Sequence, residues 1–281
     1  MKLSIITVNL NNRDGLQKTI DSVVSQTFHD FEWIVIDGGS TDGSRELIEQ
    51  YAERFAYWVS EPDKGIYNAM NKGIKVAKGE YLQFLNSGDC LFNESTLEKC
   101  FSYGFTSDIA YGDLYLSGEK GLETVCYPDA LSLRFFYQQT LCHNSIFIRR
   151  SVQIEELYDE RMKLVSDQKF LIIQSFKNKT FYHINEFVVL YDLSGVSSVN
   201  TEQVCLERSK MLKELMPKML VRDFETMDRM DVMKQKLNHP RVKKVLEYSE
   251  KKKLYRKMIT GCLRIIGVLD NLSWKKGKFQ S

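Results

Sequence analysis

The chain has 281 residues, of which 43% are hydrophobic and 27% charged, a composition typical of a soluble globular protein with one or two domains. The formal net charge is +2, and no recognition motif accompanies the basic residues, so we expect no nucleic-acid partner. No apolar run approaches the roughly 20 residues that a membrane-spanning helix needs.

The six cysteines include no Cys-x-x-Cys pair and no metal-binding spacing. The chain runs from Met1-Lys2-Leu3 directly into an apolar strand, without the pattern of a signal peptide. We therefore expect reduced thiols and a cytoplasmic location.

The first half of the chain alternates short apolar runs with stretches of helical periodicity. The apolar runs predict strands, and the periodic stretches between them predict helices beginning near Leu16, Leu47 and Ile66. Such alternation predicts an α/β fold whose parallel sheet has helices on both faces. The predicted strands cover residues 3–8, 31–36, 57–60 and 81–85.

The middle of the chain is less regular. A helix is predicted over 170–176, and the short runs 181–184 and 187–191 are predicted to pair with each other as strands. Further strands are predicted over 109–111, 113–116, 124–127 and 145–148.

A loop at Ser194–Ser198 is the predicted domain boundary and a candidate flap over the site. Beyond Thr201 the composition shifts to Lys, Glu, Leu and Met, which favours helices. We expect Pro217 and Pro240 to divide this region. The predicted domains are residues 1–200 and a helical, basic region 201–281.

Asp37 ends the second predicted strand and opens the segment Asp37-Gly-Gly-Ser-Thr-Asp-Gly-Ser44. A strand-to-helix turn with a Ser or Asp cap accounts for most of these residues. A carboxylate at a strand end also suits a ligand, because it can accept from the N–H of a base or from a ribose hydroxyl. The segment is not Gly-x-Gly-x-x-Gly, which disfavours a dinucleotide fold.

The segment after the third strand, Ser60-Glu-Pro-Asp-Lys-Gly65, contains a second carboxylate, Asp63. Pro62 and Gly65 predict a turn, and Asp63 would serve there as a helix cap. The alternative places Asp63 near a base or ribose, with Lys64 or Lys72 near phosphate.

Asp89 closes a polar turn that directly follows the strand 81–85. Ligands of α/β proteins bind at strand ends, and a carboxylate suits a hard divalent cation. The turn therefore predicts a cation site, although one carboxylate alone is weak evidence.

Six segments in order resemble the family 2 glycosyltransferases. The resemblance is strong from Lys2 to Asp89, weaker to Ser198 and absent beyond. It implies the GT-A fold and inverting transfer from a nucleotide-diphosphate sugar. The segments are Ser4-Ile-Ile-Thr-Val-Asn-Leu-Asn11, Ser22-Val-Val-Ser-Gln-Thr27, Ile34-Val-Ile-Asp-Gly-Gly-Ser-Thr-Asp-Gly-Ser44, Ser60-Glu-Pro-Asp-Lys-Gly65, Ala69-Met-Asn-Lys-Gly-Ile74 and Phe84-Leu-Asn-Ser-Gly-Asp89.

The resemblance implies a role for individual residues. Asp37 would bind the base, usually uracil, and Asp89 would hold Mn²⁺ or Mg²⁺ against the diphosphate. The other residues implied to bind the nucleotide are Thr7, Asn9, Asp63, Lys64 and Asn86.

The chain departs from the family pattern at two places. The first loop is Val8-Asn9-Leu10-Asn11 where the family often has Pro-Thr-Tyr-Asn, so a stacking Tyr is missing. Asn86 and Gly88 stand where acids are usual. We therefore expect metal binding to be weak or to depend on the phosphates of the donor.

An inverting transferase needs a base for the acceptor hydroxyl, and the resemblance assigns this role to Asp167. A purely structural role for Asp167 is also possible from the sequence, as the cap of the helix 168–176. Asp159 and Glu160 are the alternative bases. His143 resembles an acceptor-side position, although a lone His is more often structural.

The C-terminal region is basic. From Arg241 onward there are twelve Lys and Arg residues against three Asp and Glu, a net charge of +9. Apolar residues between the bases over 251–269 predict an amphipathic helix. Such a helix either contacts an anionic membrane surface or packs on the catalytic domain.

The residues and the resemblance together predict an inverting glycosyltransferase of cell-surface polysaccharide synthesis. Its partners would be a UDP-sugar donor and a saccharide or lipid-linked acceptor, and it would sit peripherally on the inner face of the plasma membrane. Two alternatives remain: a nucleotidyltransferase, for which Asn9-Leu-Asn-Asn-Arg13 is a poor triphosphate loop, and a non-catalytic sugar-nucleotide-binding protein.

Overall fold

The structure is a computed structural model that describes residues 1–118, 121–192, 201–244 and 257. Contacts between Cα atoms group residues 1–216 into one compact unit and residues 217–281 into a second. The loop Ser194–Ser198 and the basic stretch 251–269 hold two of the predictions above and lie outside the described residues, Lys257 excepted.

The N-terminal half alternates strands and helices as predicted. The four strands are parallel and lie side by side in the order β3-β2-β1-β4. The elements are β1 (Leu3–Asn9), α1 (Arg13–Val24), β2 (Phe31–Asp37), α2 (Ser44–Gln50), the 3-10 turn η1 (Ala52–Arg54), β3 (Tyr57–Ser60), α3 (Ile66–Val76) and β4 (Tyr81–Phe84).

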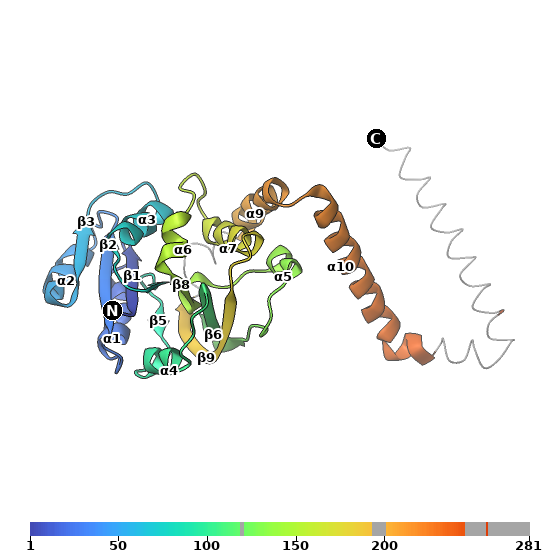
Figure 1. The fold of residues 1–281 in the computed structure, drawn as a ribbon, viewed down its shortest axis with the longest axis horizontal. Coiled ribbons are helices and arrows are strands. Elements are labelled where there is room, and N and C mark those ends of the chain that lie inside the picture. The colour runs from blue at the N-terminus through green and yellow to red at the C-terminus, as the bar shows by residue number, and fades with distance from the viewer. Residues whose placement is uncertain (119–120, 193–200, 245–256, 258–281) are drawn as a thin grey trace. The chain divides into compact units, whose positions relative to one another are not determined.

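The second half completes one mixed sheet of order β3-β2-β1-β4-β8-β6-β9-β5, with β7 paired to β6. Figure 1 shows β3, β2 and β1 toward one end and β6 and β9 toward the other. The elements are β5 (Cys90–Leu91), α4 (Thr96–Ser102), β6 (Ile109–Gly118), β7 (Gly121–Val125), α5 (Leu133–Gln138), the 3-10 turn η2 (His143–Ser145), β8 (Ile146–Arg149), α6 (Arg150–Glu155), α7 (Ser166–Phe176) and β9 (Phe181–Asp192).

Two predictions about this half are wrong. The runs 109–111 and 113–116 are not separate strands but parts of the single strand β6. The runs 181–184 and 187–191 are not two strands paired with each other: they form the single strand β9, which pairs in parallel with β6. Between Gly112 and Leu114 the register shifts, and such an irregularity lets one strand absorb extra residues without a turn.

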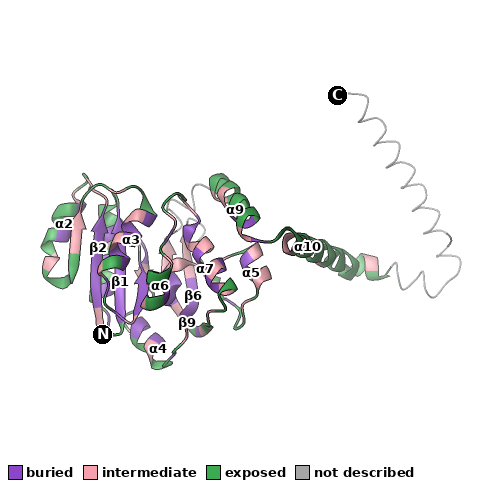
Figure 2. Ribbon diagram, turned by 45° about the horizontal axis from the view of Figure 1, so that its top comes forward, coloured by how far each residue is buried: buried purple, intermediate pink, exposed green. Residues whose placement is uncertain are grey.

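The core explains why the central strands are almost wholly apolar. Every residue of β1 is buried, as expected of a strand covered on both faces (Figure 2). On one face Leu3 and Ile5 share a cluster with Leu16 and Ile20 of α1. On the other, α3 packs so closely that a Cβ at its Gly73 would lie 2.5 Å from a methyl group of Ile6.

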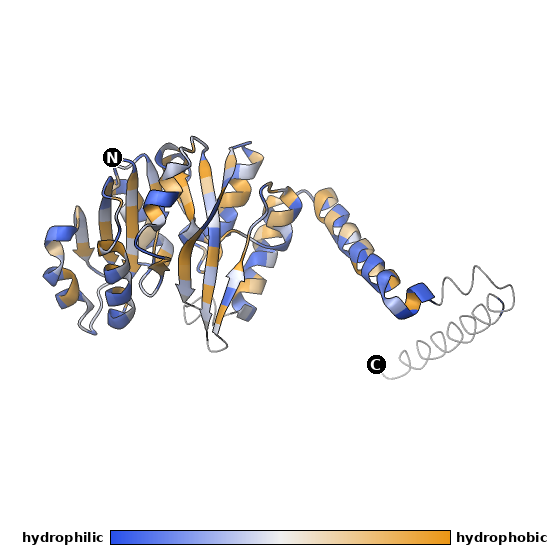
Figure 3. Cartoon of the chain, turned by 90° about the horizontal axis from the view of Figure 1, so that it is seen from below, coloured by the Kyte–Doolittle hydropathy of each residue, from blue (hydrophilic) through white to orange (hydrophobic). Residues whose placement is uncertain are grey.

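The residues described beyond position 200 are largely helical, as the composition predicted, and a further helical stretch begins at Pro240. Helix α9 (Thr201–Leu215) belongs to the first compact unit, and α10 (Lys218–Asn238) belongs to the second. Pro217 separates them, and Figure 3 shows apolar and polar residues alternating along α10. The division into domains after residue 200 stays a prediction.

Within the described residues, no helix combines the length and the apolar character needed to cross a membrane.

Candidate active site

The predicted site residues come from elements that end or begin at one edge of the sheet. β1, β2 and β4 are parallel, so their carboxyl ends meet there. β8 is antiparallel to β4, and η2, which directly precedes β8, therefore lies at the same edge.

Asp37 is the centre of the first polar cluster. It is fully buried, and it lies opposite Asn9 in the register of β1 and β2. Its Oδ1 accepts from Asn9 Nδ2 at 2.7 Å, and its Oδ2 accepts from the Ser60 hydroxyl at 2.6 Å and the Ser40 N–H at 2.9 Å. Burial raises the pKa of Asp37, but the hydrogen bonds from Ser40, Ser60 and Asn9 outweigh it and bring the pKa below its ordinary value. Asp37 is therefore an ionised carboxylate that accepts several hydrogen bonds, and its bonds to Ser40 order the loop after β2.

Asp63 lies directly against that loop. A Cβ added to Gly38 would come within 2.5 Å of Asp63 Oδ2, so a larger residue there would require the Asp63 carboxylate to shift. Asp63 Oδ1 accepts from the N–H of Gly65 at 2.8 Å, just before α3. Lys64 is exposed beside it. The structure thus brings Asn9, Asp37 and Asp63 together at the end of β2, with Lys64 at the rim.

Thr7 is the predicted nucleotide residue whose side chain the structure does not bring to this edge. It is fully buried, and its hydroxyl accepts from the indole N–H of Trp33 at 3.0 Å. Thr7 lies one pleat deeper in β1 than Asn9, and Trp33 occupies the space beside it. Its side chain therefore belongs to the core.

The turn Asn86–Asp89 forms the second cluster. The N–H of Asp89 donates to the carbonyl of Asn86 at 3.0 Å, and Gly88 has φ +106, which favours glycine. The Thr19 hydroxyl of α1 accepts from the Gly88 N–H at 3.0 Å and donates to the Asp89 carbonyl at 2.8 Å. These bonds fix Asp89 at the end of β4.

The donor set of this turn suits a cation that is shared with a ligand. The Asp89 carboxylate is 5% exposed and accepts from Asn144 Nδ2 at 2.5 Å. In the described part of the chain, no three His, Cys, Asp or Glu side chains gather where they could hold a metal ion. Mg²⁺ is often held by only one or two carboxylates plus substrate phosphates. The residues therefore fit Mg²⁺ or Mn²⁺ bound together with a diphosphate.

Asp167 forms the third cluster, in the first turn of α7. The helix is preceded by Val165 at its N-cap and has no side-chain cap, so the interpretation of Asp167 as the cap does not describe its contacts. Its Oδ1 accepts from the Tyr67 hydroxyl at 2.8 Å, and its Oδ2 lies 3.1 Å from His143 Nδ1. Burial raises the pKa of Asp167, but its interactions with His143, the Tyr67 hydroxyl and the backbone of Gln168 together outweigh burial and leave the pKa below its ordinary value.

The predictions did not include Tyr67 and Asn144 among the site residues. Tyr67 is 5% exposed and shares a helix face with the buried Met70 and Ile74, so its spacing indicated a core residue. Asn144 adjoins His143, and in the sequence nothing sets it apart from an ordinary turn residue. Their contacts with Asp167 and Asp89 cross 100 and 55 positions of sequence.

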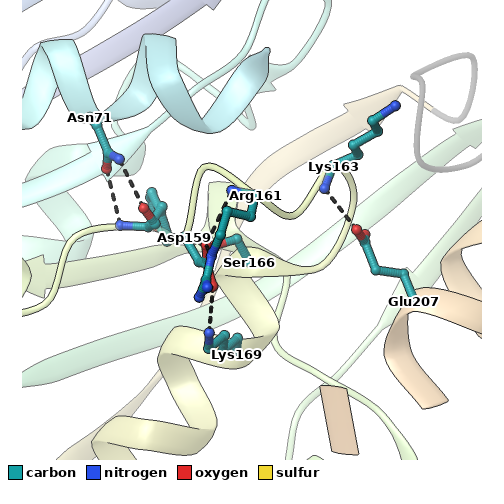
Figure 4. A network of polar contacts seen from close by, with 8 residues as sticks. Asn71, Asp159, Arg161, Lys163, Ser166, Lys169 and Glu207 are labelled. Atoms are coloured by element: carbon teal, nitrogen blue, oxygen red, sulfur yellow. Dashed lines mark hydrogen bonds and ion pairs between the residues drawn. The ribbon is translucent and has the colours of Figure 1, made fainter. Parts of the chain in front are cut away.

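The alternative bases, Asp159 and Glu160, contact other residues than Asp167 does, and Figure 4 shows the contacts of Asp159. Asp159 pairs with Arg161 at 2.8 Å and with Lys169 at 2.6 Å. The hydrogen bond from Arg161 is the largest cause that brings the pKa of Asp159 well below its usual range. Glu160 accepts from Asn68 and Asn71. A carboxylate already paired with two cations is a poor base, so the geometry disfavours Asp159.

Helix α9 is fastened to the segment that precedes Asp167. The Glu207 carboxylate accepts from the N–H of Lys163 at 2.9 Å (Figure 4) and from the N–H of Leu164 at 2.7 Å. Arg208 donates to Gln168 Oε1 at 3.0 Å and to three carbonyls around the end of α5, those of Phe136, Tyr137 and Gln139. α9 therefore supports the segment that leads into α7 and Asp167.

Known proteins resemble this chain in sequence and in fold. The model of glycosyl transferase family 2 matches residues 4–148. A PGL/p-HBAD biosynthesis glycosyltransferase of Mycobacterium tuberculosis is 29% identical over 75% of this chain and 85% of that protein. The putative teichuronic acid biosynthesis glycosyltransferase TuaG of Bacillus subtilis is 34% identical over 39% of this chain and 44% of that protein.

Solved structures share the fold. S. aureus TarS in complex with UDP-GlcNAc superimposes with a TM-score of 0.60 at 20% identity, covering 75% of this chain and 67% of that chain. A longer TarS chain is covered over only 40% of its length. The mannosyltransferase PcManGT of Pyrobaculum calidifontis, in complex with GDP-Man and Mn²⁺, gives a TM-score of 0.56 at 14% identity, covering 75% of this chain and 61% of that chain. With a family model that matches half of its length, the chain belongs to glycosyl transferase family 2 and is a glycosyltransferase.

Proposed function

We propose that this protein is an inverting glycosyltransferase that moves a sugar from a nucleotide diphosphate, UDP in the first instance, to a hydroxyl of a saccharide or lipid-linked acceptor. Residues 1–200 would form its catalytic domain. One observation carries the proposal: His143 and Asn144, adjacent on η2, contact Asp167 and Asp89. The carboxylate suited to a base and the carboxylate suited to a metal–diphosphate therefore face the same small segment.

The two carboxylates would have different roles. Asp167 would take the proton of the acceptor hydroxyl, and the oxygen would attack the anomeric carbon. The bond from that carbon to the diphosphate would break, and the electron pair would leave with the nucleoside diphosphate. Attack from the face opposite the leaving group inverts the anomeric centre and needs only one base. A divalent cation held at Asp89 would neutralise charge on the departing diphosphate.

The nucleotide would lie at the end of β2. Asp37 and Asp63 would bind the base and the ribose. Asn9 would hold Asp37 in place, and Asn86 would lie near the phosphates. The complexes of TarS with UDP and UDP-GlcNAc support a UDP-sugar, and the complex of PcManGT with GDP-Man and Mn²⁺ supports a divalent cation while making GDP the first competitor.

We infer a cell-surface polysaccharide or glycolipid as product from the names of the bacterial relatives. The basic residues from Arg241 onward would be attracted to the anionic lipids of the inner leaflet of the plasma membrane. Peripheral binding there would bring the site close to a lipid-linked acceptor.

Calorimetric binding of UDP, GDP, CDP and dTDP, each with Mn²⁺ and again with EDTA, tests the donor site. We expect metal-dependent preference for UDP, followed by sugar transfer with inversion from the matching UDP-sugar. Release of pyrophosphate from a nucleoside triphosphate would instead support a nucleotidyltransferase. Binding of a donor without transfer to any saccharide or lipid-linked acceptor would support a non-catalytic sugar-nucleotide-binding protein.

A further inference from the structure

A chain of two hydrogen bonds joins the donor-side turn to Asp167. Asn86 Nδ2 lies 2.8 Å from His143 Nε2, and His143 Nδ1 lies 3.1 Å from Asp167 Oδ2. The Tyr67 hydroxyl donates to the other carboxylate oxygen at 2.8 Å. Asn86 opens the turn that ends in Asp89, so the two halves of the site share this chain.

The chemistry of its ends determines which ring nitrogen of His143 carries the proton. An amide NH₂ group can only donate and an ionised carboxylate can only accept. Nε2, which faces the amide nitrogen of Asn86, must therefore offer its lone pair, and Nδ1 must carry the hydrogen that is donated to Asp167. With the Asn86 amide in this orientation, the imidazole between them would be neutral, in the Nδ1–H tautomer.

The oxygen of the Asn86 amide, Oδ1, shows how the orientation of this amide affects the charge of His143. Asn86 Oδ1 is buried and has no hydrogen-bond partner among the residues that the structure describes. If the amide were turned over, Oδ1 would accept from a protonated Nε2, and His143 would become an imidazolium between Asn86 and Asp167. The orientation of one amide thus decides the charge beside Asp167, and orienting an Asn requires evidence from its hydrogen-bond network.

We propose that Asn86 is a positioning residue that holds His143 as the neutral Nδ1–H tautomer. This deepens the proposed function, because it rests on the role of Asp167 as base. A neutral Nδ1–H donor orients the carboxylate of Asp167. An imidazolium in its place would stabilise the anion further and weaken it as a base.

The test is the ¹⁵N spectrum of the histidine rings in the full-length protein at pH 7.5. The chain has four histidines, and the H143N variant identifies the signals of His143. We expect a protonated Nδ1 and an unprotonated Nε2. The opposite neutral tautomer, or two protonated nitrogens, would overturn the proposal. The spectrum requires no turnover, so its result is independent of whether the transferase proposal is correct.

The variant N86D adds a functional measurement. A carboxylate can only accept, so it would draw a proton onto Nε2. We expect an imidazolium at pH 7.5 and a kcat reduced by about tenfold or more. The control N178D makes the same change at an exposed position and should leave the His143 signals unmoved. An N86D protein whose His143 stays in the wild-type tautomer would contradict the positioning role.

Discussion

The hydroxyl of Tyr67, in the first turn of α3, donates to Oδ1 of Asp167, in the first turn of α7, at 2.8 Å. Burial and the neighbouring Asp167 charge raise the pKa of Tyr67 well above its ordinary value, so the phenol stays protonated and remains a donor. Tyr67, which follows the turn of Asp63 in sequence, therefore stabilises the carboxylate of Asp167, the proposed base.

Replacing Tyr67 with Phe should raise the pKa of Asp167, because one of the bonds that lowers it is removed. A base with a higher pKa is protonated sooner as the pH falls. The acidic limb of the kcat/KM profile should therefore move to higher pH. An unmoved acidic limb in a Y67F enzyme of wild-type Tm would show that this bond does not tune Asp167.

Asp167→Asn keeps the shape of the side chain but removes the proton acceptor. We expect kcat to fall by about 10²-fold or more, while the Kd for UDP stays within about threefold, because Asp167 is not a proposed nucleotide contact. The control D14N neutralises a carboxylate that is 92% exposed and should retain full activity. Transfer at the wild-type rate by D167N would exclude Asp167 as the base.

Asp89→Asn should remove the metal dependence of UDP binding and leave the protein folded. Asp89 is the proposed protein ligand of the cation, so the wild-type affinity for UDP should depend on Mn²⁺ and the D89N affinity should not. Calorimetry with Mn²⁺ and with EDTA measures both. If EDTA leaves the wild-type Kd for UDP unchanged, the metal role of Asp89 is wrong even if transfer is observed.

Arg208 should matter for stability, because its side chain supplies hydrogen bonds to three carbonyls and to Gln168. Arg208→Ala leaves these acceptors without their donor, and we expect the free energy of unfolding to fall by about 2 kcal/mol. The matched control is R229A in α10, where the arginine contacts the nearby Thr226; its effect should be within about 0.5 kcal/mol. Chemical denaturation measures both variants. If R208A and R229A lower the free energy of unfolding equally, the hydrogen bonds of Arg208 do not stabilise the packing of α9.

Asp37 should contribute stability that depends on pH. Its pKa is lowered in the folded protein, so the contribution is present above the unfolded value of about 3.9 and is lost as the pH falls through the folded pKa. Unfolding of the wild type and of D37N is therefore compared by denaturant titration between pH 7 and pH 3. The difference between the free energies of unfolding of the two proteins should be constant down to about pH 4.5 and shrink below it. A difference that grows in acid would show that the pKa of Asp37 is not lowered in the folded protein.

The sequence by itself determined the first half of the fold and the places of Asp37, Asp63 and Asp89. These features are local: apolar runs, helical spacing and turn residues predict each element, and parallel strands then bring their carboxyl ends to one edge. Only the tertiary structure decided that β9 is one strand parallel to β6, that Trp33 takes the hydroxyl of Thr7 into the core, and that α9 clamps the segment before Asp167.

The contacts of the proposed base belong to this second group. Tyr67 has the spacing of a core residue, and His143 has the appearance of a lone structural histidine. Their roles become visible only when α3, η2 and α7 meet, because a hydrogen bond between side chains that lie 24 and 100 positions apart in sequence is set by the packing of those elements and leaves no periodicity in the sequence.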